Sequence, residues 1–197
     1  PAVQQVLHWV CNAKIGDLLL RDLQPHDQLR ELEFHFPIQK PESATLFSLI
    51  RGKQGEEGED GDSGSFLARR DVMKGFIDLI ARKDGKYYIL DYKSNYLGGQ
   101  PEDYKPESLK RAVMDSGYDL QYSIYLVALI RYLRARVPDF TIEEHIGGVG
   151  YLFVRGMDPA FGEGSGVYFC KPEASVLQRL DEELKRPAYR SRVMEHS

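Results

Sequence analysis

The feature that most constrains this chain is the dipeptide Asp84-Gly85, which separates two runs of residues with high strand propensity. The first run is 72–83 (VMKGFIDLIARK) and the second is 86–93 (KYYILDYK). An Asp-Gly pair in this setting is a strong signal for a β-hairpin with a two-residue turn. Counting outward from that turn, Ile80 pairs with Ile89, and Asp78 pairs with Asp91. We therefore expect an antiparallel hairpin in this register.

The predicted hairpin gathers charged groups on one face. Side chains alternate between the faces of a strand, so Asp78, Asp91 and Lys93 are expected to emerge together. The same face is expected to carry three apolar side chains, Phe76, Ile80 and Ile89. Two carboxylates directly opposite each other destabilise a sheet. An apolar face does not bear such charges unless a ligand, a metal or a partner group satisfies them.

A divalent cation is the interpretation that fits this pair of carboxylates. Hard oxygen ligands suit Mg²⁺, and Mn²⁺ can substitute for it. Lys93 would then stabilise charge beside the metal without binding it. Two alternatives remain open. The hairpin could expose solvated acids, with Lys93 screening Asp91, or Asp78 could be protonated because Asp91 is close to it.

The bulk composition is that of one globular domain. A chain of 197 residues, 42% hydrophobic and 28% charged, is long enough for one full core and short for two. No apolar run reaches the length of a membrane span and no signal peptide opens the chain. Cys11 and Cys170 are too isolated for a disulfide framework or a zinc site, so a cytoplasmic location is expected. Pro1 followed directly by a helical pattern suggests a fragment of a longer polypeptide.

The net charge of −4 is concentrated in one segment. Residues 51–65 hold five acidic residues against Arg51 and Lys53, a net of −3, which leaves −1 for the rest of the chain. This segment has no apolar side chain to bury, so we expect a flexible acidic surface loop. The acidity of the whole chain therefore does not exclude a nucleic acid as its partner.

Hydrophobic periodicity predicts the remaining elements. Strands are expected at 29–38, 147–155 and 166–171, and helices at 1–22, 107–116, 118–137 and 173–185. A mixture of strands and helices in this order indicates an α/β fold with a mixed β-sheet flanked by α-helices.

The pattern D-(x)n-(D/E)-x-K, formed in this chain by Asp78, Asp91 and Lys93, resembles the PD-(D/E)XK nuclease superfamily. The surrounding sequence is similar to the RecB-type nuclease domains of that superfamily. That similarity runs from about 29 to 186 and is carried by 73–78, 88–98, 118–125, 147–156 and 166–168. It implies a restriction-endonuclease-like fold in which residues 1–197 form a single nuclease domain.

The resemblance also implies an activity and partners. The expected activity is that of a Mg²⁺-dependent exodeoxyribonuclease of the exodeoxyribonuclease V type, acting on single- and double-stranded DNA ends. The parent chain would be an ATP-driven helicase–nuclease with RecC-like and RecD-like partner subunits. A role in double-strand-break repair by homologous recombination, with the RecA recombinase as a further partner, follows from the same resemblance.

Residue roles carry over position by position. Asp78 and Asp91 would hold the metal with the backbone carbonyl of Tyr92, and Lys93 would be the catalytic cation. Gln121 and Tyr125 match a QxxxY motif whose residues border the active site and contact DNA or position the lysine. The two lie one helical turn apart, so they share a face. The alternative is a helix packed into the core with Gln121 at its margin. Tyr118 is a further candidate of the same kind.

Two more family positions are matched incompletely. Glu33 corresponds to an additional acidic residue on the preceding strand, and we assign it to the metal shell, although solvated acids at a sheet edge are the alternative. Glu31 and His35 are expected on its face, with His35 structural. The family also has a metal-ligating His on a helix. His8 lacks the expected neighbours, so it is expected to pack beside Trp9, with the ligand lying upstream of Pro1.

Two rival functions remain open. One is a catalytically weak or inactive nuclease-like module that docks partner subunits or RecA. Such a module should have lost Lys93 or an acid, whereas this chain keeps all three residues. The other is a different metal-dependent phosphohydrolase. That class would show a His/Asp-rich set or a phosphate-binding Gly loop, and the sequence has neither.

Overall fold

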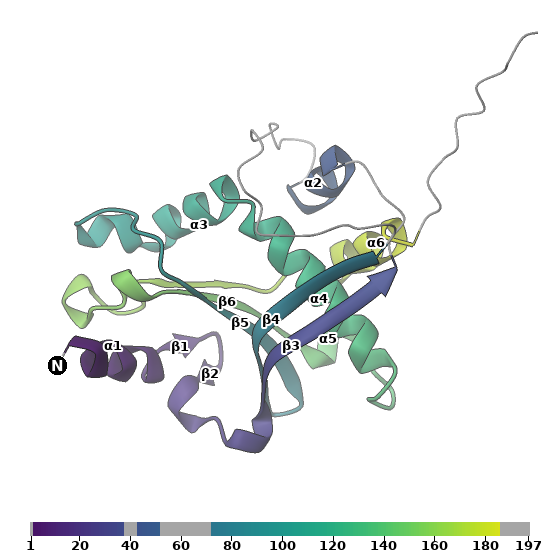
Figure 1. Cartoon of the computed structure of the whole chain (residues 1–197), viewed down its shortest axis with the longest axis horizontal. Coiled ribbons are helices and arrows are strands. Elements are labelled where there is room, and N and C mark those ends of the chain that lie inside the picture. Colours follow the sequence, from purple (N-terminus) through teal and green to yellow (C-terminus); the bar gives the residue numbers. More distant parts are fainter. Residues whose placement is uncertain (1, 38–42, 52–71, 186–197) are drawn as a thin grey trace, which may run out of the picture.

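The computed structural model describes residues 2–37, 43–51 and 72–185, built around a five-stranded sheet (Figure 1). The strand order is β3-β4-β5-β6-β7. These strands are β3 Gln28–Pro37, β4 Val72–Lys83, β5 Lys86–Lys93, β6 Ile146–Phe153 and β7 Val167–Cys170. The β5–β6 pair is parallel and the other pairs are antiparallel. The sheet is therefore mixed, as the sequence predicts.

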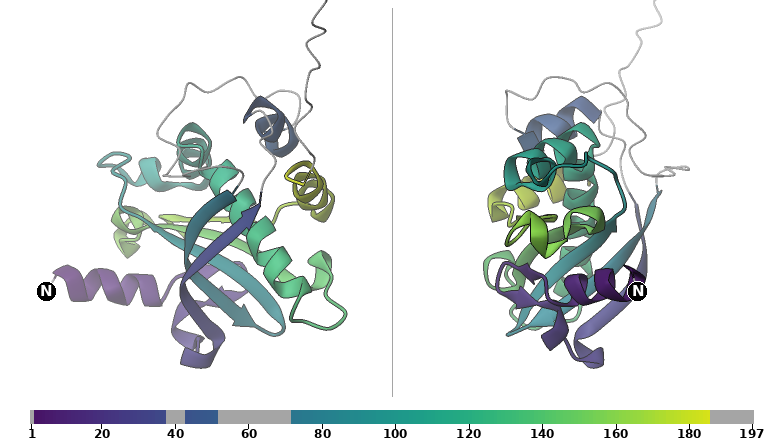
Figure 2. Two further views of the ribbon diagram at one scale, coloured as in Figure 1. Left: turned by 45° about the vertical axis from the view of Figure 1, so that its right-hand side comes forward. Right: turned by 90° about the vertical axis from the view of Figure 1, so that its left-hand side faces the viewer.

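Helices cover both faces of this sheet (Figures 1 and 2). One face packs against α4 (Tyr118–Arg134), with α2 (Ser43–Arg51), α3 (Pro106–Asp115) and α6 (Ala174–Glu183) around it. The short α5 (Ile142–His145) leads into β6. The other face carries α1 (Ala2–Cys11) and a small hairpin of β1 (Lys14–Ile15) and β2 (Leu18–Leu19). The restriction-endonuclease-like α/β class, a mixed sheet flanked by helices, is thus confirmed.

Short 3₁₀ turns connect these elements, at Leu20–Asp22, Pro25–Asp27, Pro101–Tyr104, Val154–Gly156 and Pro159–Phe161. Buried residues form two hydrophobic cores, one on each face of the sheet. The first core joins Ile80, Ile89 and Val149 to the inner side of α4. The second joins Leu79 and Leu90 to Val10, Ile15 and Leu18. The sheet is the shared wall between them.

The central hairpin has the predicted turn and register. Lys83 pairs with Lys86, and the ladder continues to the pair Leu79–Leu90. Asp84 and Gly85 both have positive φ, 50° and 77°, which is the backbone that a two-residue turn of this twist requires. Asp78 and Asp91 are the next residues along each strand beyond the last paired position.

Strict alternation fails on β4, and with it the prediction for Phe76. Ile77 and Ile80 belong to the same core, whereas Leu79 belongs to the opposite one. The facing strand is irregular at the same level, because Glu31 has a left-handed φ of 52° between the pairs Arg30–Leu79 and Leu32–Ile77. The two strands therefore switch faces together. Phe76 does not share the face of Ile80 and is instead 51% exposed.

Most other elements match their predicted positions within a few residues, but the N-terminal helix is shorter than expected. It ends at Cys11, because a turn at Gly16, with φ 58°, folds the chain into the β1–β2 hairpin. Helix α2 is not predicted by the sequence pattern. It includes Arg51, so the acidic segment begins after it, and residues 52–65 lie outside the described residues. Within the described part of the chain, no helix is both long and apolar enough to cross a membrane.

Candidate active site

A buried ion pair lies at the end of β5. The Lys93 ammonium is 2.8 Å from Asp91 Oδ1, and the two residues are 9% and 5% exposed. Their i, i+2 spacing on one strand places both on the α4 side of the sheet. Lysine is rarely this buried unless partner groups replace its water. The structure thus brings together two of the predicted site residues.

Helix α4 brings Gln121 and Tyr125 to this pair. Lys93 Nζ donates to Gln121 Oε1 at 3.1 Å, and Gln121 Nε2 donates to the Tyr125 hydroxyl at 3.2 Å. Gln121 therefore contacts the predicted catalytic lysine, and Tyr125 contacts Gln121. Their proposed contact with DNA stays a prediction.

Aromatic rings complete the surroundings of Lys93. Its ammonium lies 4.0 Å from the ring centroid of Tyr118 and 4.8 Å from that of Tyr151. Such contacts stabilise a cation by about 0.5–2 kcal/mol, more when it is desolvated. The Tyr118 hydroxyl donates to Asn95 Oδ1 at 3.1 Å, which ties the loop after β5 to α4.

Asp78 is exposed and acts on this cluster through its charge. Burial raises the pKa of Asp91, the Lys93 ammonium opposes that rise, and the Asp78 carboxylate adds to it. Burial likewise raises the pKa of Tyr125 to about 12, with the negative charges of Asp91 and Asp78 contributing. The three predicted residues Asp78, Asp91 and Lys93 are therefore electrostatically coupled.

The donor set is compatible in kind with a divalent cation. Among the described residues, no group of three or more His, Cys, Asp or Glu side chains is arranged to hold a metal. Mg²⁺, however, uses one or two carboxylates together with waters and substrate phosphates. Asp78, Asp91 and the carbonyl of Tyr92 can supply such oxygens. The raised pKa of Asp91 marks a carboxylate whose charge a cation would stabilise.

Glu33 lies in a different group of side chains. It contacts Lys74 at 2.5 Å and His35 at 3.0 Å, with a side chain that is 43% exposed. A hydrogen bond from Lys74, and then one from His35, lowers the pKa of Glu33. Its neighbour Phe34 faces α4. Across the part of the chain that the structure describes, no contact joins Glu33 to Asp78 or Asp91, and its metal role stays a prediction.

The prediction for His8 is wrong. His8 is exposed on α1, and the neighbouring Asn12 side chain donates to its backbone carbonyl at 2.8 Å. The buried side of α1 is formed by Val10, with Val6 and Trp9 partly buried beside it. His8 is two residues from both Val6 and Val10, which places its side chain on the opposite side of the helix from them, so it does not pack in this core.

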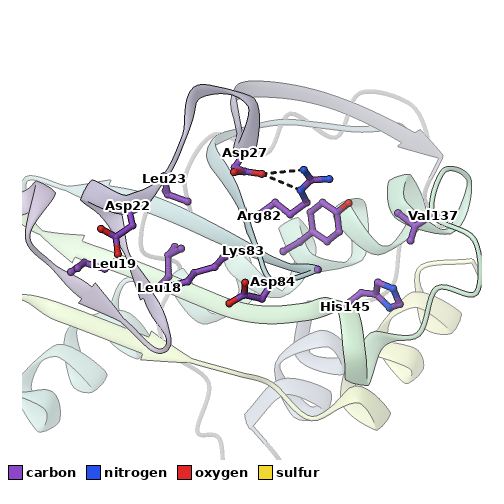
Figure 3. A pocket seen from close by; sticks show the side chains of 12 residues that line it. Leu18, Leu19, Asp22, Leu23, Asp27, Arg82, Lys83, Asp84, Val137 and His145 are labelled. Atoms are coloured by element: carbon purple, nitrogen blue, oxygen red, sulfur yellow. Dashed lines mark hydrogen bonds and ion pairs between the residues drawn. The ribbon is translucent and has the colours of Figure 1, made fainter.

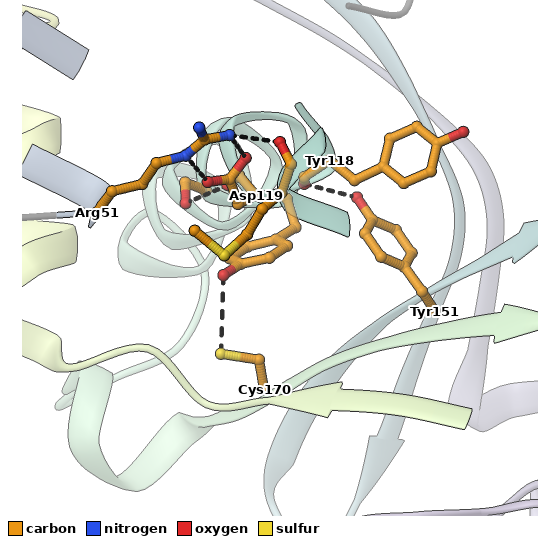
Figure 4. A network of polar contacts seen from close by, with 8 residues as sticks. Arg51, Tyr118, Asp119, Tyr151 and Cys170 are labelled. Carbon is orange, nitrogen blue, oxygen red and sulfur yellow. Dashed lines mark hydrogen bonds and ion pairs between the residues drawn. The ribbon is translucent and has the colours of Figure 1, made fainter. Parts of the chain in front are cut away.

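Sequence reasoning missed two contributors to this region (Figure 4). Tyr151 of β6 is fully buried and pairs in register with Asp91, yet the sequence pattern marks it only as part of a matching segment. Arg51 of α2 forms a two-pronged ion pair with Asp119 of α4, beside Tyr118. The uncharged run 146–153 (IGGVGYLF) predicts a buried strand and could have pointed to Tyr151, whereas the sequence carries no signal for the Arg51 contact.

A pocket of about 420 Å³ lies elsewhere, at the turn end of the hairpin (Figure 3). It is lined by Leu18, Asp22, Asp84 and His145, among others, and Arg82 in its wall pairs with Asp27 at 3.1 Å. Asp91 and Lys93 are at the opposite end of β5, so this pocket is separate from the candidate active site.

Comparisons with known proteins agree with the geometry. The family model described as the PD-(D/E)XK nuclease superfamily matches residues 8–194. The chain is 38% identical over 163 residues to RecBCD enzyme subunit RecB of Escherichia coli K12, covering 83% of this chain and 14% of that protein. Against the Haemophilus influenzae RecB, the identity is 37% over 180 residues, which covers 91% and 14%.

A third RecB, from Mycobacterium tuberculosis H37Rv, is 34% identical over 192 residues, covering 86% of this chain and 18% of the relative. The chain thus spans only 14–18% of the length of these relatives. The family model covers nearly the whole chain, and two residues of its D-(x)n-D-x-K pattern, Asp91 and Lys93, are in contact. This chain belongs to the PD-(D/E)XK nuclease superfamily.

Proposed function

We propose that this chain is a metal-dependent DNA nuclease domain of a RecB-type helicase–nuclease. One observation carries the proposal: Asp91 and Lys93 form a buried ion pair at 2.8 Å, with Asp78 close enough to raise the pKa of Asp91. A structural hairpin has no need for an acid and a lysine that are both buried beside a second, exposed acid. Residues 1–197 would then be one nuclease domain of a longer chain.

Each residue has a chemical role in this proposal. Asp78, Asp91 and the backbone carbonyl of Tyr92 would hold Mg²⁺, or Mn²⁺ in its place. When bound, such a cation polarises the phosphodiester and lowers the pKa of water. The Lys93 ammonium, aimed by Gln121, would stabilise negative charge that develops on the phosphate. Glu33 would assist only from a distance, since its contacts are with Lys74 and His35.

Partners follow from the names of the relatives. Those relatives are subunits of a RecBCD enzyme, so we propose RecC-like and RecD-like subunits as partners of this chain in the cytoplasm. Single- and double-stranded DNA ends are the proposed substrates and RecA a further proposed partner. The rival proposal, a docking module without catalysis, is less favoured because the three predicted catalytic residues are retained and two of them, Asp91 and Lys93, are in contact.

The test compares cleavage by matched variants. Linear single- and double-stranded DNA is incubated with the protein and Mg²⁺ or Mn²⁺. We expect Asp91→Asn and Lys93→Gln each to lower the rate by about 100-fold or more. Lys74→Gln is the control, because Lys74 is an exposed lysine on β4 that pairs with Glu33 instead. Equal activity in the wild type and both site variants would indicate a contaminating nuclease and defeat the proposal.

Calorimetric titration with Mn²⁺ separates the two candidate functions. A nuclease site should bind Mn²⁺ in the wild type and lose that binding in Asp91→Asn. Absence of both metal binding and cleavage in the wild type would favour the docking module.

A further inference from the structure

The hydroxyl of Tyr151 lies at the centre of the polar contacts around Lys93. It is 3.0 Å from Gln121 Oε1 and 3.0 Å from the backbone carbonyl oxygen of Tyr118. Figure 4 shows the Tyr151 side chain rising from β6 toward the start of α4. Tyr151 is fully buried, so it cannot contact DNA directly. Any effect that it has on catalysis must pass through its neighbours.

The Gln121 amide has two possible orientations, and its neighbours select one. Its oxygen lies 3.1 Å from Lys93 Nζ and 3.0 Å from the Tyr151 hydroxyl, while its nitrogen donates to Tyr125 at 3.2 Å. An amide oxygen has two lone pairs and its nitrogen has two donors. The reverse orientation would turn the NH₂ group toward the Lys93 ammonium, where donor would meet donor.

We propose that Tyr151 is a positioning residue of the nuclease site: its hydroxyl fixes the Gln121 amide with the oxygen toward Lys93, and that oxygen aims the ammonium. The inference rests on the proposed function and adds a residue outside the D-(x)n-D-x-K and QxxxY patterns. Burial raises the pKa of Tyr151 well above its ordinary value, so the hydroxyl keeps the proton that it donates.

The ring and the hydroxyl of Tyr151 have separable roles. The ring forms part of the aromatic wall 4.8 Å from Lys93 Nζ, and Tyr151→Phe keeps it. That variant loses the contacts of the hydroxyl with Gln121 Oε1 and with the Tyr118 carbonyl oxygen. The Gln121 oxygen would then have one donor instead of two, and the amide could rotate. We expect Lys93 to remain in place but to spend less time aimed at the phosphate.

Tyr122 provides a matched control. It is another buried tyrosine, its ring is 6.1 Å from that of Tyr151, and its hydroxyl is directed at Cys170 Sγ at 3.8 Å instead of at Gln121. Tyr151→Phe should lower the single-turnover cleavage rate at saturating DNA by about 10-fold. The dissociation constant for DNA, measured with Ca²⁺ in place of Mg²⁺, should be unchanged. Tyr122→Phe should change neither quantity.

A double-mutant cycle tests whether Tyr151 acts through Gln121. If it does, the variant Tyr151→Phe/Gln121→Ala should be no slower than Gln121→Ala alone. Additive losses would overturn the inference, as would a Tyr151→Phe variant that cleaves at the wild-type rate while Lys93→Gln is inactive. In the latter case the proposed function would stand and only the role of Tyr151 would fail.

Lysine ammonium NMR supplies a readout that does not need cleavage. Lys93 Nζ donates to Asp91 and to the Gln121 oxygen, and Tyr151→Phe should make the second of these acceptors less fixed. Hydrogen exchange at Lys93 Nζ should therefore be faster in Tyr151→Phe and unchanged in Tyr122→Phe. An unchanged Lys93 signal in Tyr151→Phe overturns the inference even if the chain proves unable to cleave DNA.

Discussion

At the scale of single residues, the buried charge of Lys93 is the central problem. Taking an ammonium out of water costs several kcal/mol unless other groups replace its hydration. Here a carboxylate, an amide oxygen and two rings do so. The same arrangement makes Asp91 depend on Lys93, because burial and Asp78 both raise the pKa of that carboxyl. Removing the Lys93 ammonium should therefore make the buried Asp91 carboxylate lower the free energy of unfolding.

This dependence gives a pH prediction for the metal-free protein. Lys93→Met keeps the side-chain length but removes the charge that opposes the rise in the pKa of Asp91. When the pKa of an acid is raised in the folded protein, its contribution to stability is fully present below the pKa of the unfolded chain, about 3.9. That contribution is lost as the pH rises through the pKa of the folded protein. The loss in unfolding free energy relative to wild type should therefore be larger at pH 8 than at pH 5.

Urea unfolding at the two pH values measures this difference. Lys74→Met is the control, since Lys74 is exposed and pairs with Glu33 outside the cluster. A penalty for Lys93→Met that is the same at pH 5 and pH 8 would contradict the coupling between Lys93 and Asp91.

At the scale of elements, two buried carboxylates attach neighbouring helices to α4. Asp119, in the first turn of α4, binds Arg51 of α2 through both of its oxygens (Figure 4). Asp181 of α6 contacts Arg131 and Arg134 of α4, each at 2.7 Å. We call the Arg51–Asp119 ion pair the first clamp and the ion pairs of Asp181 the second clamp. The first clamp lies next to Tyr118 and Gln121 in α4, so it holds the end of α4 that faces the candidate active site.

Breaking the first clamp should be costly. Arg51→Met leaves Asp119 buried with its main cation removed, which should cost about 3–5 kcal/mol of unfolding free energy. Arg51→Met/Asp119→Leu removes both charges, so it should recover part of that loss. Urea unfolding measures both variants. A double variant that is less stable than Arg51→Met would contradict this account.

The second clamp makes α6 docking sensitive to acid. Burial alone would raise the pKa of Asp181, but hydrogen bonds from Lys185, Arg131 and Arg134 outweigh it and lower that pKa. When the pKa of an acid is lowered in the folded protein, its contribution to stability is fully present above the pKa of the unfolded chain, about 3.9. That contribution is lost as the pH falls through the pKa of the folded protein. Wild type should therefore lose stability below about pH 4 more steeply than Asp181→Asn. Denaturant midpoints between pH 7 and pH 2 test this, with the exposed Glu182→Gln variant expected to retain the wild-type slope.

At the scale of the whole molecule, the sequence predicted what depends on neighbours along the chain. The Asp84-Gly85 turn, the strand register beside it, and the shared faces of Asp91 with Lys93 and of Gln121 with Tyr125 are all local, so side-chain periodicity and turn chemistry predicted them. The roles of these residues in a site were predicted from the family resemblance. The contact of Arg51 with Asp119 joins residues 68 positions apart, and it depends on how α2 packs. The face switch beside Glu31 depends on backbone twist, which side-chain alternation does not encode.

Strand β6 contributes side chains to both cores, and Gly150 in this strand leaves room for side chains of the second core. A Cβ at position 150 would lie 2.5 Å from Ile15 Cγ2 and 2.9 Å from Leu90 Cδ2. Both distances are shorter than any ordinary carbon–carbon contact. The absence of a side chain therefore allows the β1–β2 hairpin, which carries Ile15, to pack directly on the sheet.

Gly150→Ala should push that hairpin away from the sheet. Overpacking of this kind costs about 1–3 kcal/mol of unfolding free energy. Trp9 is the sole tryptophan and packs at the edge of the second core, so its fluorescence reports the N-terminal segment directly. In an Ile15→Ala background the nearest clashing atom is gone, and the added cost of Gly150→Ala should shrink. The same added cost in both backgrounds would mean that the strain lies in β6 or against Leu90 and that Ile15 is not the side chain for which Gly150 makes room.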